Sequence, residues 1–158
     1  MALQVLINLL VAFLWMFLQD EWSMLSFFSG YLVGILIVFV LRRFFPSSFY
    51  LKKCFAAVYL FWVFFRESIV SSIYVIGHVI RPRLKITPGI FRLETELESD
   101  LEVTLLALLI TLTPGSVVMK VTPDKKAFYV HALNLPDSVI AVISSKNKFE
   151  HAIRKVTR

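Results

Sequence analysis

The side chains best suited to proton or ion chemistry interrupt an apolar stretch at residues 54–80. Arg66 and Glu67 are adjacent there, and polar residues recur at helical spacing at Glu67, Ser71, Tyr74 and His78. Ionisable groups at membrane depth are costly and often mark proton or ion paths. We favour the alternative, a structural role or a contact with a partner chain, because adjacent residues on a helix point about 100° apart and pair poorly.

The histidines and carboxylates form no recognisable metal site or catalytic pair. His78 has no second histidine or carboxylate at a ligand spacing, so we expect it to be solvated or to face a partner. An acidic group comprises Glu94, Glu96, Glu98, Asp100 and Glu102. Such a group could attract a cation, but its first three members fit the solvent face of a strand, and the other two favour a helix N-terminus. We therefore expect neither a bound metal nor a cofactor.

Signatures of common enzyme classes are also missing from the sequence. No glycine-rich phosphate loop precedes a helix, and no GxSxG pattern occurs. The single cysteine, Cys54, has no base near it in the sequence. A small membrane enzyme would need a cluster of perturbed titratable groups, which these residues do not supply.

The composition indicates a membrane protein. The chain has 158 residues, of which 58% are hydrophobic and 18% are charged. A soluble domain of this size cannot bury that much apolar surface, and a disordered chain would be far less hydrophobic, so both classes are excluded. The net charge of +6 comes from basic residues that flank apolar segments. That placement is typical of cytoplasmic loops beside anionic lipid and not of a nucleic-acid-binding surface.

Two uncharged segments, at about 2–18 and 23–41, are each close to the ~20 residues needed to cross the hydrocarbon core. In lipid they must be helical, because unpaired backbone groups find no water there. Acidic residues lie in the turn between them, and basic residues follow them at Arg42, Arg43, Lys52 and Lys53. The positive-inside rule then places the N-terminus in the cytoplasm. The first segment lacks a basic start and a cleavage site, so residues 1–53 are predicted to be a retained transmembrane hairpin and not a signal peptide.

Small residues recur along one face of the second segment. Ser26, Gly30 and Gly34 are four residues apart, a spacing that lets another helix approach closely in lipid. Two interpretations remain open: packing within the hairpin itself, or docking on a partner subunit.

Residues 54–80 form a third apolar segment with two possible placements. Basic residues flank it on both sides, at Lys52, Lys53, Arg81, Arg83 and Lys85, so both flanks favour the cytoplasm. We expect a tilted, partly embedded amphipathic helix, with a full third span as the alternative.

The remaining residues, 81–158, are predicted to form a small cytoplasmic α+β domain of βαββα order. The first strand alternates at Phe91, Leu93 and Leu97. A capping box at 99–102 begins a helix too short to span, which ends at Pro114-Gly115. The first crossover should be right-handed, with parallel strands and the helices on one face.

Two further strands and a helix complete this domain. The second strand alternates at Val117, Met119 and Val121, and residues 122–125 form a turn. The third strand has Phe128, Val130 and Ala132 on one face, with Tyr129 and His131 on the other. Pro136, Asp137 and Ser138 begin a last helix. Its apolar positions are Val139, Ile140, Val142, Ile143, Phe149, Ile153 and Val156.

Several of these features together resemble the E-type subunits of the Mrp (Mnh) multisubunit cation/proton antiporters. They are an apolar first helix with Trp15, a span with Gly30 and Gly34, a basic amphipathic third segment, and the sequence Leu112-Thr113-Pro114-Gly115-Ser116. The resemblance covers essentially the whole chain. Members of this family usually have Thr where Ser116 stands here, so the hydroxyl is kept.

The resemblance implies a non-enzymatic plasma-membrane subunit that works with other Mrp subunits in Na+/H+ exchange. The large subunits, which resemble the antiporter-like subunits of respiratory complex I, are expected to carry the ion paths. No catalytic residue is carried over, and Pro114-Gly115 is explained by the end of a helix and the turn into a strand. A different class, a membrane-tethered adaptor whose soluble domain binds a cytosolic partner, remains the alternative.

Overall fold

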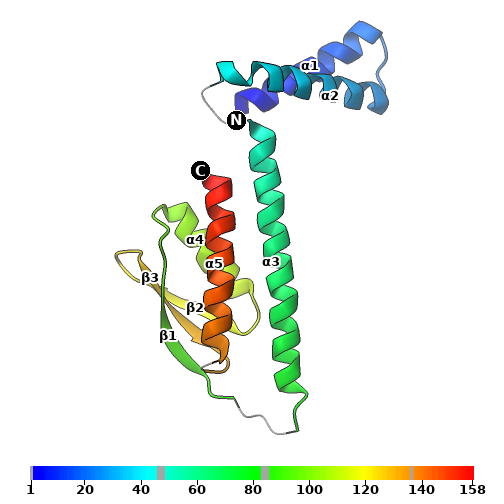
Figure 1. Cartoon of the computed structure of the whole chain (residues 1–158). Helices are drawn as coiled ribbons and strands as arrows, with labels where there is room; N and C mark the ends of the chain where they lie inside the picture. The colour runs from blue at the N-terminus through cyan, green and yellow to red at the C-terminus, as the bar shows by residue number, and fades with distance from the viewer. Residues whose placement is uncertain (1, 46–48, 83–85, 136) are drawn as a thin grey trace. The chain divides into compact units, whose positions relative to one another are not determined.

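The computed structural model describes residues 2–45, 49–82, 86–135 and 137–158 (Figure 1). These residues form two compact units, Met1–Phe55 and Ala56–Arg158. In outline the predicted class is confirmed, because a helical N-terminal region with three apolar helices is followed by a small strand-containing domain. Arg83, Lys85 and Pro136, which entered the predictions above, lie outside the described residues.

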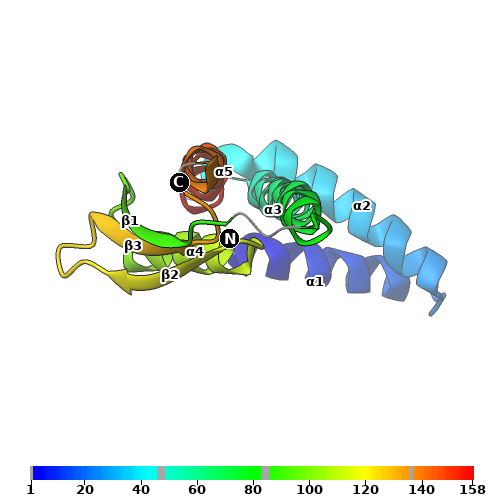
Figure 2. The ribbon, with the colours of Figure 1, turned by 90° about the horizontal axis from the view of Figure 1, so that it is seen from below.

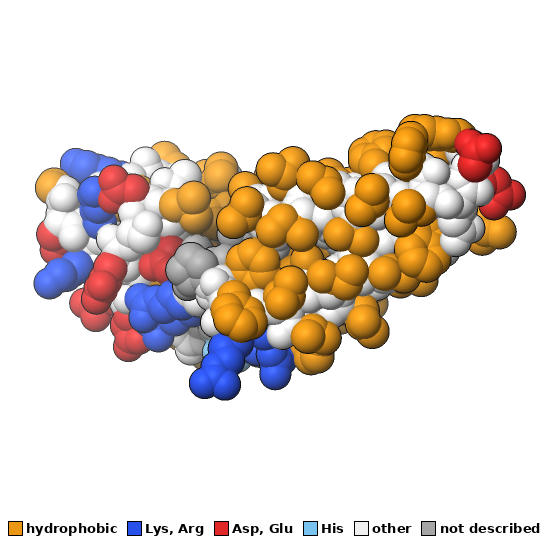
Figure 3. Space-filling model, turned by 90° about the horizontal axis from the view of Figure 1, so that it is seen from above, with side chains coloured by type: hydrophobic (Ala, Val, Ile, Leu, Met, Phe, Trp, Pro, Cys, Tyr) orange, Lys and Arg blue, Asp and Glu red, His pale blue; other side chains and the backbone are white. Residues whose placement is uncertain are grey.

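The first unit contains an antiparallel helical hairpin. Helix α1 spans Ala2–Gln19 and helix α2 spans Met24–Val40, followed by a 3-10 helix, η1, at Leu41–Phe44. Ser23 caps α2, because its Oγ accepts a hydrogen bond of 3.1 Å from the Ser26 amide. Hydrophobic side chains cover the outside of the hairpin, and acidic side chains gather at one end of it (Figure 3). Both helices are long and apolar enough to cross a membrane.

Helix α3 spans Tyr50–Val79 without interruption and is also long and apolar enough to cross a membrane. Its 30 residues correspond to about 45 Å at 1.5 Å per residue. It starts four positions before the predicted segment. From Ala56 onward it belongs to the same compact unit as the strands, and its buried residues there are Val63, Glu67 and His78.

The sheet has three strands in the order β1-β3-β2. Strand β1 spans Gly89–Glu94, β2 spans Ser116–Val121 and β3 spans Ala127–Ala132, and β3 pairs antiparallel with both others. The two strands joined by the first crossover therefore run in the same direction, but they do not pair, because β3 lies between them. Their predicted parallel direction is correct, and the handedness of the crossover remains a prediction.

Two helices complete the second unit: α4 at Asp100–Leu112 and α5 at Asp137–Thr157. Both helices pack against the inner face of the sheet and form one hydrophobic core with it. The fully buried residues of this core include Leu106, Ile110, Phe128, Phe149 and Ile153. The predicted capping box begins α4, and the Ser99 amide donates to Glu102 Oε2 at 3.5 Å. Figures 1 and 2 both show α3 running beside α5, and Val63 of α3 joins the same core.

The predicted inward face of β2 was wrong. Val117, Met119 and Val121 are exposed, and Val118 packs against the core instead. Val118 lies opposite the buried Val130, whereas Val117 lies opposite His131 on the other face of the sheet, so the register with β3 decides which side chains of β2 point inward. The pairing shifts between Val118 and Lys120, which interrupts the simple alternation at Met119.

Two apolar positions of α5 also differ from the prediction. Ile140 and Ile143 are exposed, whereas Ser138 and Ser145 are buried. The Ser145 hydroxyl bonds to Glu67 of α3, as described below, and the Ser138 hydroxyl accepts a hydrogen bond from the Asn134 amide at the start of α5.

Candidate functional site

The small residues of α2 pack within the hairpin. Ser26, Gly30 and Gly34 all lie on its buried face. A Cβ at Gly30 would lie 2.6 Å from Trp15 Cβ and 3.0 Å from the backbone of Ala12, and a Cβ at Gly34 would overlap Asn8 Oδ1. The absent side chains therefore allow α1 to approach closely, which is the first of the two interpretations left open above.

Buried polar side chains connect α1 to the start of α3. Gln4 and Asn8 are fully buried. Gln4 Oε1 accepts a hydrogen bond of 2.9 Å from the Tyr50 amide, and Asn8 Nδ2 donates to Tyr50 Oη at 2.6 Å. Tyr31 Oη of α2 lies 3.3 Å from the same hydroxyl oxygen. Sequence reasoning missed this cluster, although Gln4 and Asn8 are four residues apart in an otherwise apolar helix.

Glu67 lies at the centre of the contact between α3 and α5. Its side chain is only 5% exposed. Ser145 donates to Oε2 at 2.8 Å, and Lys148 Nζ contacts Oε1 at 2.9 Å. Both partners belong to α5, so the carboxylate is neutralised and hydrogen-bonded within the chain instead of facing a second protein.

Arg66 does pair with Glu67, contrary to the expectation from their adjacency. Arg66 Nη1 lies 2.8 Å from Glu67 Oε1. The long guanidinium side chain folds back to reach the carboxylate, while its own exposed fraction remains 59%. Two cations therefore meet one carboxylate oxygen where α3 faces α5.

His78 is buried and not solvated, which corrects a second expectation. It is 8% exposed, and its Nδ1 lies 2.9 Å from the carbonyl oxygen of Tyr74, one turn earlier. The rings of these two residues have centroids 4.3 Å apart. Local contacts on α3 thus account for His78. The polar face predicted on this helix is real, but it faces the rest of the second unit.

The turn at residues 113–116 closes α4 and opens β2. Thr113 Oγ1 donates to the Leu109 carbonyl at 2.7 Å, and Ser116 Oγ donates to the Ile110 carbonyl at 3.1 Å. These bonds satisfy carbonyl groups at the end of the helix. Gly115 has a φ of +93°, a conformation in which a side chain is strained. Pro114 stands between them and cannot continue the helix.

This turn also lines a pocket of about 210 Å³ that is walled by α3 and α5. Glu67, Ser145 and Lys148 lie at its polar side. The Tyr74 hydroxyl is buried without a hydrogen-bond partner among the described residues. The pocket is lined largely by apolar and hydroxyl side chains, and it brings the glutamate and the turn motif, far apart in the sequence, to one place.

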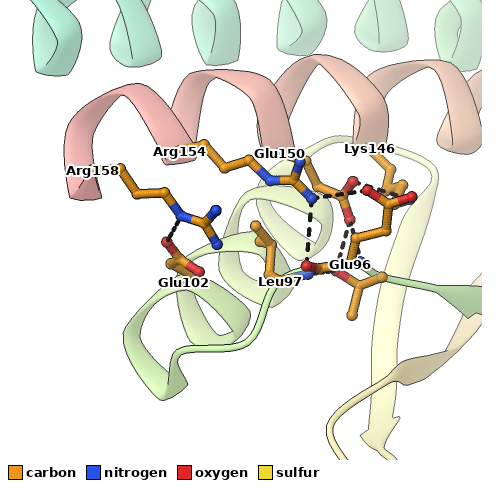
Figure 4. A network of polar contacts seen from close by, with 8 residues as sticks. Glu96, Leu97, Glu102, Lys146, Glu150, Arg154 and Arg158 are labelled. Atoms are coloured by element: carbon orange, nitrogen blue, oxygen red, sulfur yellow. Dashed lines mark hydrogen bonds and ion pairs between the residues drawn. The ribbon is translucent and has the colours of Figure 1, made fainter.

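The acidic residues near α4 serve to hold α5 (Figure 4). Arg154 Nη2 contacts Glu96 Oε2 at 2.9 Å, and Thr157 Oγ1 donates to Glu102 Oε1 at 2.6 Å. The Thr157 hydrogen bond is the main reason that the pKa of Glu102 lies below its ordinary value. Paired with Glu96, the Arg154 guanidinium has a raised pKa.

A second buried carboxylate belongs to the same network. Glu150 Oε1 accepts a hydrogen bond of 2.6 Å from Thr95, and Lys146 lies 3.1 Å from Glu150 Oε2. Within the described residues, no three histidine, cysteine or acidic side chains are grouped so that they could hold a metal ion. These contacts fasten the last helix to the segment that follows β1 and to α4.

Comparison with known proteins connects this architecture to one family. The model of the MNHE family, described as a Na+/H+ ion antiporter subunit, matches residues 8–156. The chain is 42% identical to the E-type subunit of the Na+/H+ antiporter of Bacillus subtilis, and the match covers 100% of both chains. It is 41% identical, again over 100% of both chains, to the E-type subunit of the Na+/H+ antiporter of Alkalihalophilus pseudofirmus.

Two solved structures are similar as well. A chain of the Mrp complex from Dietzia sp. is 33% identical, with a TM-score of 0.46 over 65% of this chain and 94% of that one. A chain of the archaeal membrane-bound sulfane sulfur reductase is 20% identical, with a TM-score of 0.56 over 97% of this chain and 98% of that one, and therefore shares the fold. From the family match and the full-length relatives, we conclude that this chain belongs to the family of Na+/H+ antiporter E subunits.

Proposed function

We propose that this chain is a non-catalytic assembly component of a multisubunit antiporter that exchanges Na+ for H+ across the plasma membrane. Its hairpin would pack among other membrane subunits, and its sheet domain would lie in the cytoplasm. The curated relatives are named as E-type subunits of Na+/H+ antiporters, and they match this chain from end to end, which supports a role as one subunit among several.

One observation carries the proposal: the two fully buried amide side chains of α1 are engaged by Tyr50, at the start of α3, within the same compact unit. Gln4 and Asn8 both bond to Tyr50. Ion transport through a bundle needs ionisable or hydrated groups that face a cavity. In the described part of α1 and α2 every residue is uncharged. The ion path would then belong to other subunits.

The hairpin keeps an apolar surface for those subunits or for lipid. Because Gly30 and Gly34 are used inside the hairpin, a neighbouring helix must contact other faces. An open apolar groove on α1 offers such a face, lined by residues that include Leu6, Leu10, Phe13 and Phe17. Packing of a helix against this groove would need no hydrogen bond, as is usual for association in lipid.

The contacts of α3 support partial embedding over a complete crossing. From Tyr59, whose ring lies 4.7 Å from Lys155 Nζ, to Glu67, which bonds Lys148, one face of α3 is covered by the charged helix α5. A segment that is packed against such a helix cannot be surrounded by lipid on all sides. The opposite face is apolar and exposed, as in helices that lie at the membrane surface.

Affinity purification tests the proposal. The tagged chain, purified in mild detergent from cells that express the complete antiporter, should co-elute with large polytopic subunits. Reconstituted alone into vesicles, it should not exchange Na+ for H+. Exchange by the isolated chain at a rate comparable to that of the complex would disprove the assignment.

Orientation is tested separately by labelling. In a Cys54→Ser background, Asp20→Cys should react only with an impermeant maleimide added outside the cell, and Arg158→Cys only after the membrane is opened. The positive-inside rule predicts this pattern. Labelling of Arg158→Cys from outside would reverse the proposed topology but would leave the assembly role intact.

A membrane-tethered adaptor is the second candidate, and the outer face of the sheet favours it. Ile90, Met119 and Tyr129 are exposed there at 60%, 62% and 41%. Such a face could receive a cytosolic protein. Recovery of the chain with a soluble protein and without polytopic subunits would support the adaptor and contradict the assembly role.

A further inference from the structure

We propose that the groove between α3 and α5 binds the phosphate group of an anionic phospholipid. The lining of this groove includes Tyr59, Trp62, Arg66, Asn147, Lys148 and His151, all within the second unit. This inference rests on the placement of α3 at the membrane surface that is proposed above.

The charge of the groove fits an anion. Arg66 and Lys148 converge on the same oxygen of Glu67, at 2.8 and 2.9 Å, so their cationic groups lie close together. Their side chains nevertheless remain 59% and 43% exposed, and both retain donors that Glu67 does not occupy. Two positive charges against one carboxylate leave a net positive charge. Apart from Glu67, which is 5% exposed and lies behind them, the described residues place no acidic side chain in the groove.

Further groups extend this positive region along α5. Lys155 Nζ lies 4.7 Å from the centre of the Tyr59 ring, one turn beyond His151. Asn147 supplies an amide beside Lys148. A phosphate that enters the groove would therefore find a guanidinium, an ammonium and an amide donor on two facing helices, and bidentate contact is available from Arg66.

The apolar surroundings indicate a lipid and not a free phosphate. Trp62 is 62% exposed and Tyr59 is 42% exposed, and these amphipathic rings are typical of the level of the lipid headgroups. On the outer face of α3, next to Trp62, the exposed side chains are apolar at Phe61, Phe65 and Ile69. A free anion would leave this surface uncovered, whereas acyl chains would cover it while the headgroup occupies the groove.

Quenching of Trp62 by brominated lipids tests the inference. The full chain carries three tryptophans, so Trp15→Phe and Trp22→Phe leave Trp62 as the only reporter. It is reconstituted in phosphatidylcholine nanodiscs that contain a small fraction of brominated phosphatidylglycerol or, for comparison, brominated phosphatidylcholine. From the quenching of Trp62 fluorescence, we expect the groove to bind phosphatidylglycerol in preference to phosphatidylcholine. The preference should be about five-fold for each cationic side chain that contacts the headgroup.

Substitutions distinguish the effect of the groove on lipid binding from the effect of the protein's overall charge. Arg66→Gln should reduce the preference about five-fold, because Ser145 and Lys148 still hold Glu67, whereas Arg66→Lys should retain most of it. Lys126→Gln removes the same charge beside the turn between β2 and β3 and should change nothing. Circular dichroism confirms that each variant is folded.

Other results would contradict the inference. Equal quenching by the two brominated lipids, or equal loss of preference in Arg66→Gln and Lys126→Gln, would overturn the headgroup site while leaving α3 at the membrane. Release of brominated phosphatidylglycerol by millimolar inorganic phosphate would show a small-anion site and contradict the lipid assignment. Absence of quenching by either lipid would instead overturn the proposed placement of α3, and with it the inference.

Discussion

The fit between Gly34 and Asn8 yields the sharpest test of how the hairpin is held together. In Gly34→Ala the new Cβ would overlap Asn8 Oδ1, so the buried amide must move and its bond to Tyr50 Oη is lost. Overpacking of this kind costs about 1–3 kcal/mol, and an interhelical hydrogen bond in lipid contributes roughly 0.6 kcal/mol. We therefore expect the free energy of unfolding to fall by about 2–4 kcal/mol.

A second substitution should relieve this strain. Asn8→Ala removes the overlapping oxygen, so adding Gly34→Ala in that background should cost less than about 1 kcal/mol. Gly30→Ala is the matched control. Its Cβ would lie 2.6 Å from Trp15 Cβ and 3.0 Å from the Ala12 backbone, neither of which Asn8→Ala changes. Asn8→Ala should therefore not rescue Gly30→Ala.

Titration with sodium dodecyl sulfate in mixed micelles measures these free energies. With Trp22→Phe and Trp62→Phe, Trp15 is the only tryptophan, and it lies at the interface of the two helices. If the costs of Asn8→Ala and Gly34→Ala add within about 0.5 kcal/mol, the two sites are independent and the reasoning is refuted.

Two further predictions concern the second unit. Because the pKa of Glu102 is lowered in the folded state, chiefly by the Thr157 hydrogen bond, its contribution is present above its ordinary pKa of 4.5 and is lost as the pH falls through the lower, folded value. Thermal unfolding, followed by circular dichroism at a series of acidic pH values, measures this loss. Glu102→Gln should make the stability of the protein less dependent on pH in that range, and an unchanged pH dependence would contradict the assignment. Gly115→Ala should destabilise by about 1–3 kcal/mol, because φ is +93° and Val75 Cγ2 lies 3.2 Å from the new Cβ. Gly77→Ala, in open space on α3, should be neutral or stabilising, and equal effects at the two glycines would argue against the strained turn.

The long elements of the fold were predictable because their signals are local. Uncharged runs of near-spanning length gave the two hairpin helices to within a residue or two. The capping box at Ser99 and the break at Pro114 located both ends of α4. Capping, turns and apolar runs depend only on neighbours in the sequence, so they can be read without knowledge of the tertiary structure.

The partners of the polar residues were not predictable in this way. Glu67 bonds to Ser145 and Lys148, which are about eighty positions away, and no periodicity within α3 points to them. The inward face of β2 depends on its register with β3, which the alternation of residues within β2 does not reveal. Because Arg66 and Glu67 are adjacent on the helix, we did not expect them to pair, but the long arginine side chain reaches the carboxylate.

The order of the elements, in which α5 follows the other helices and the strands, has a consequence for biosynthesis. Glu67 and Glu102 both accept hydrogen bonds from hydroxyl groups of α5, so until α5 has been synthesised each carboxylate has only local partners, such as Arg66 or the Ser99 amide. Strand β1 likewise cannot pair until β3 has been synthesised, since β3 is its only neighbour in the described sheet. The hairpin can therefore enter the membrane before α3 has packed against α5, and a chain truncated before α5 would expose the face of α3 around Glu67 to quality-control proteases.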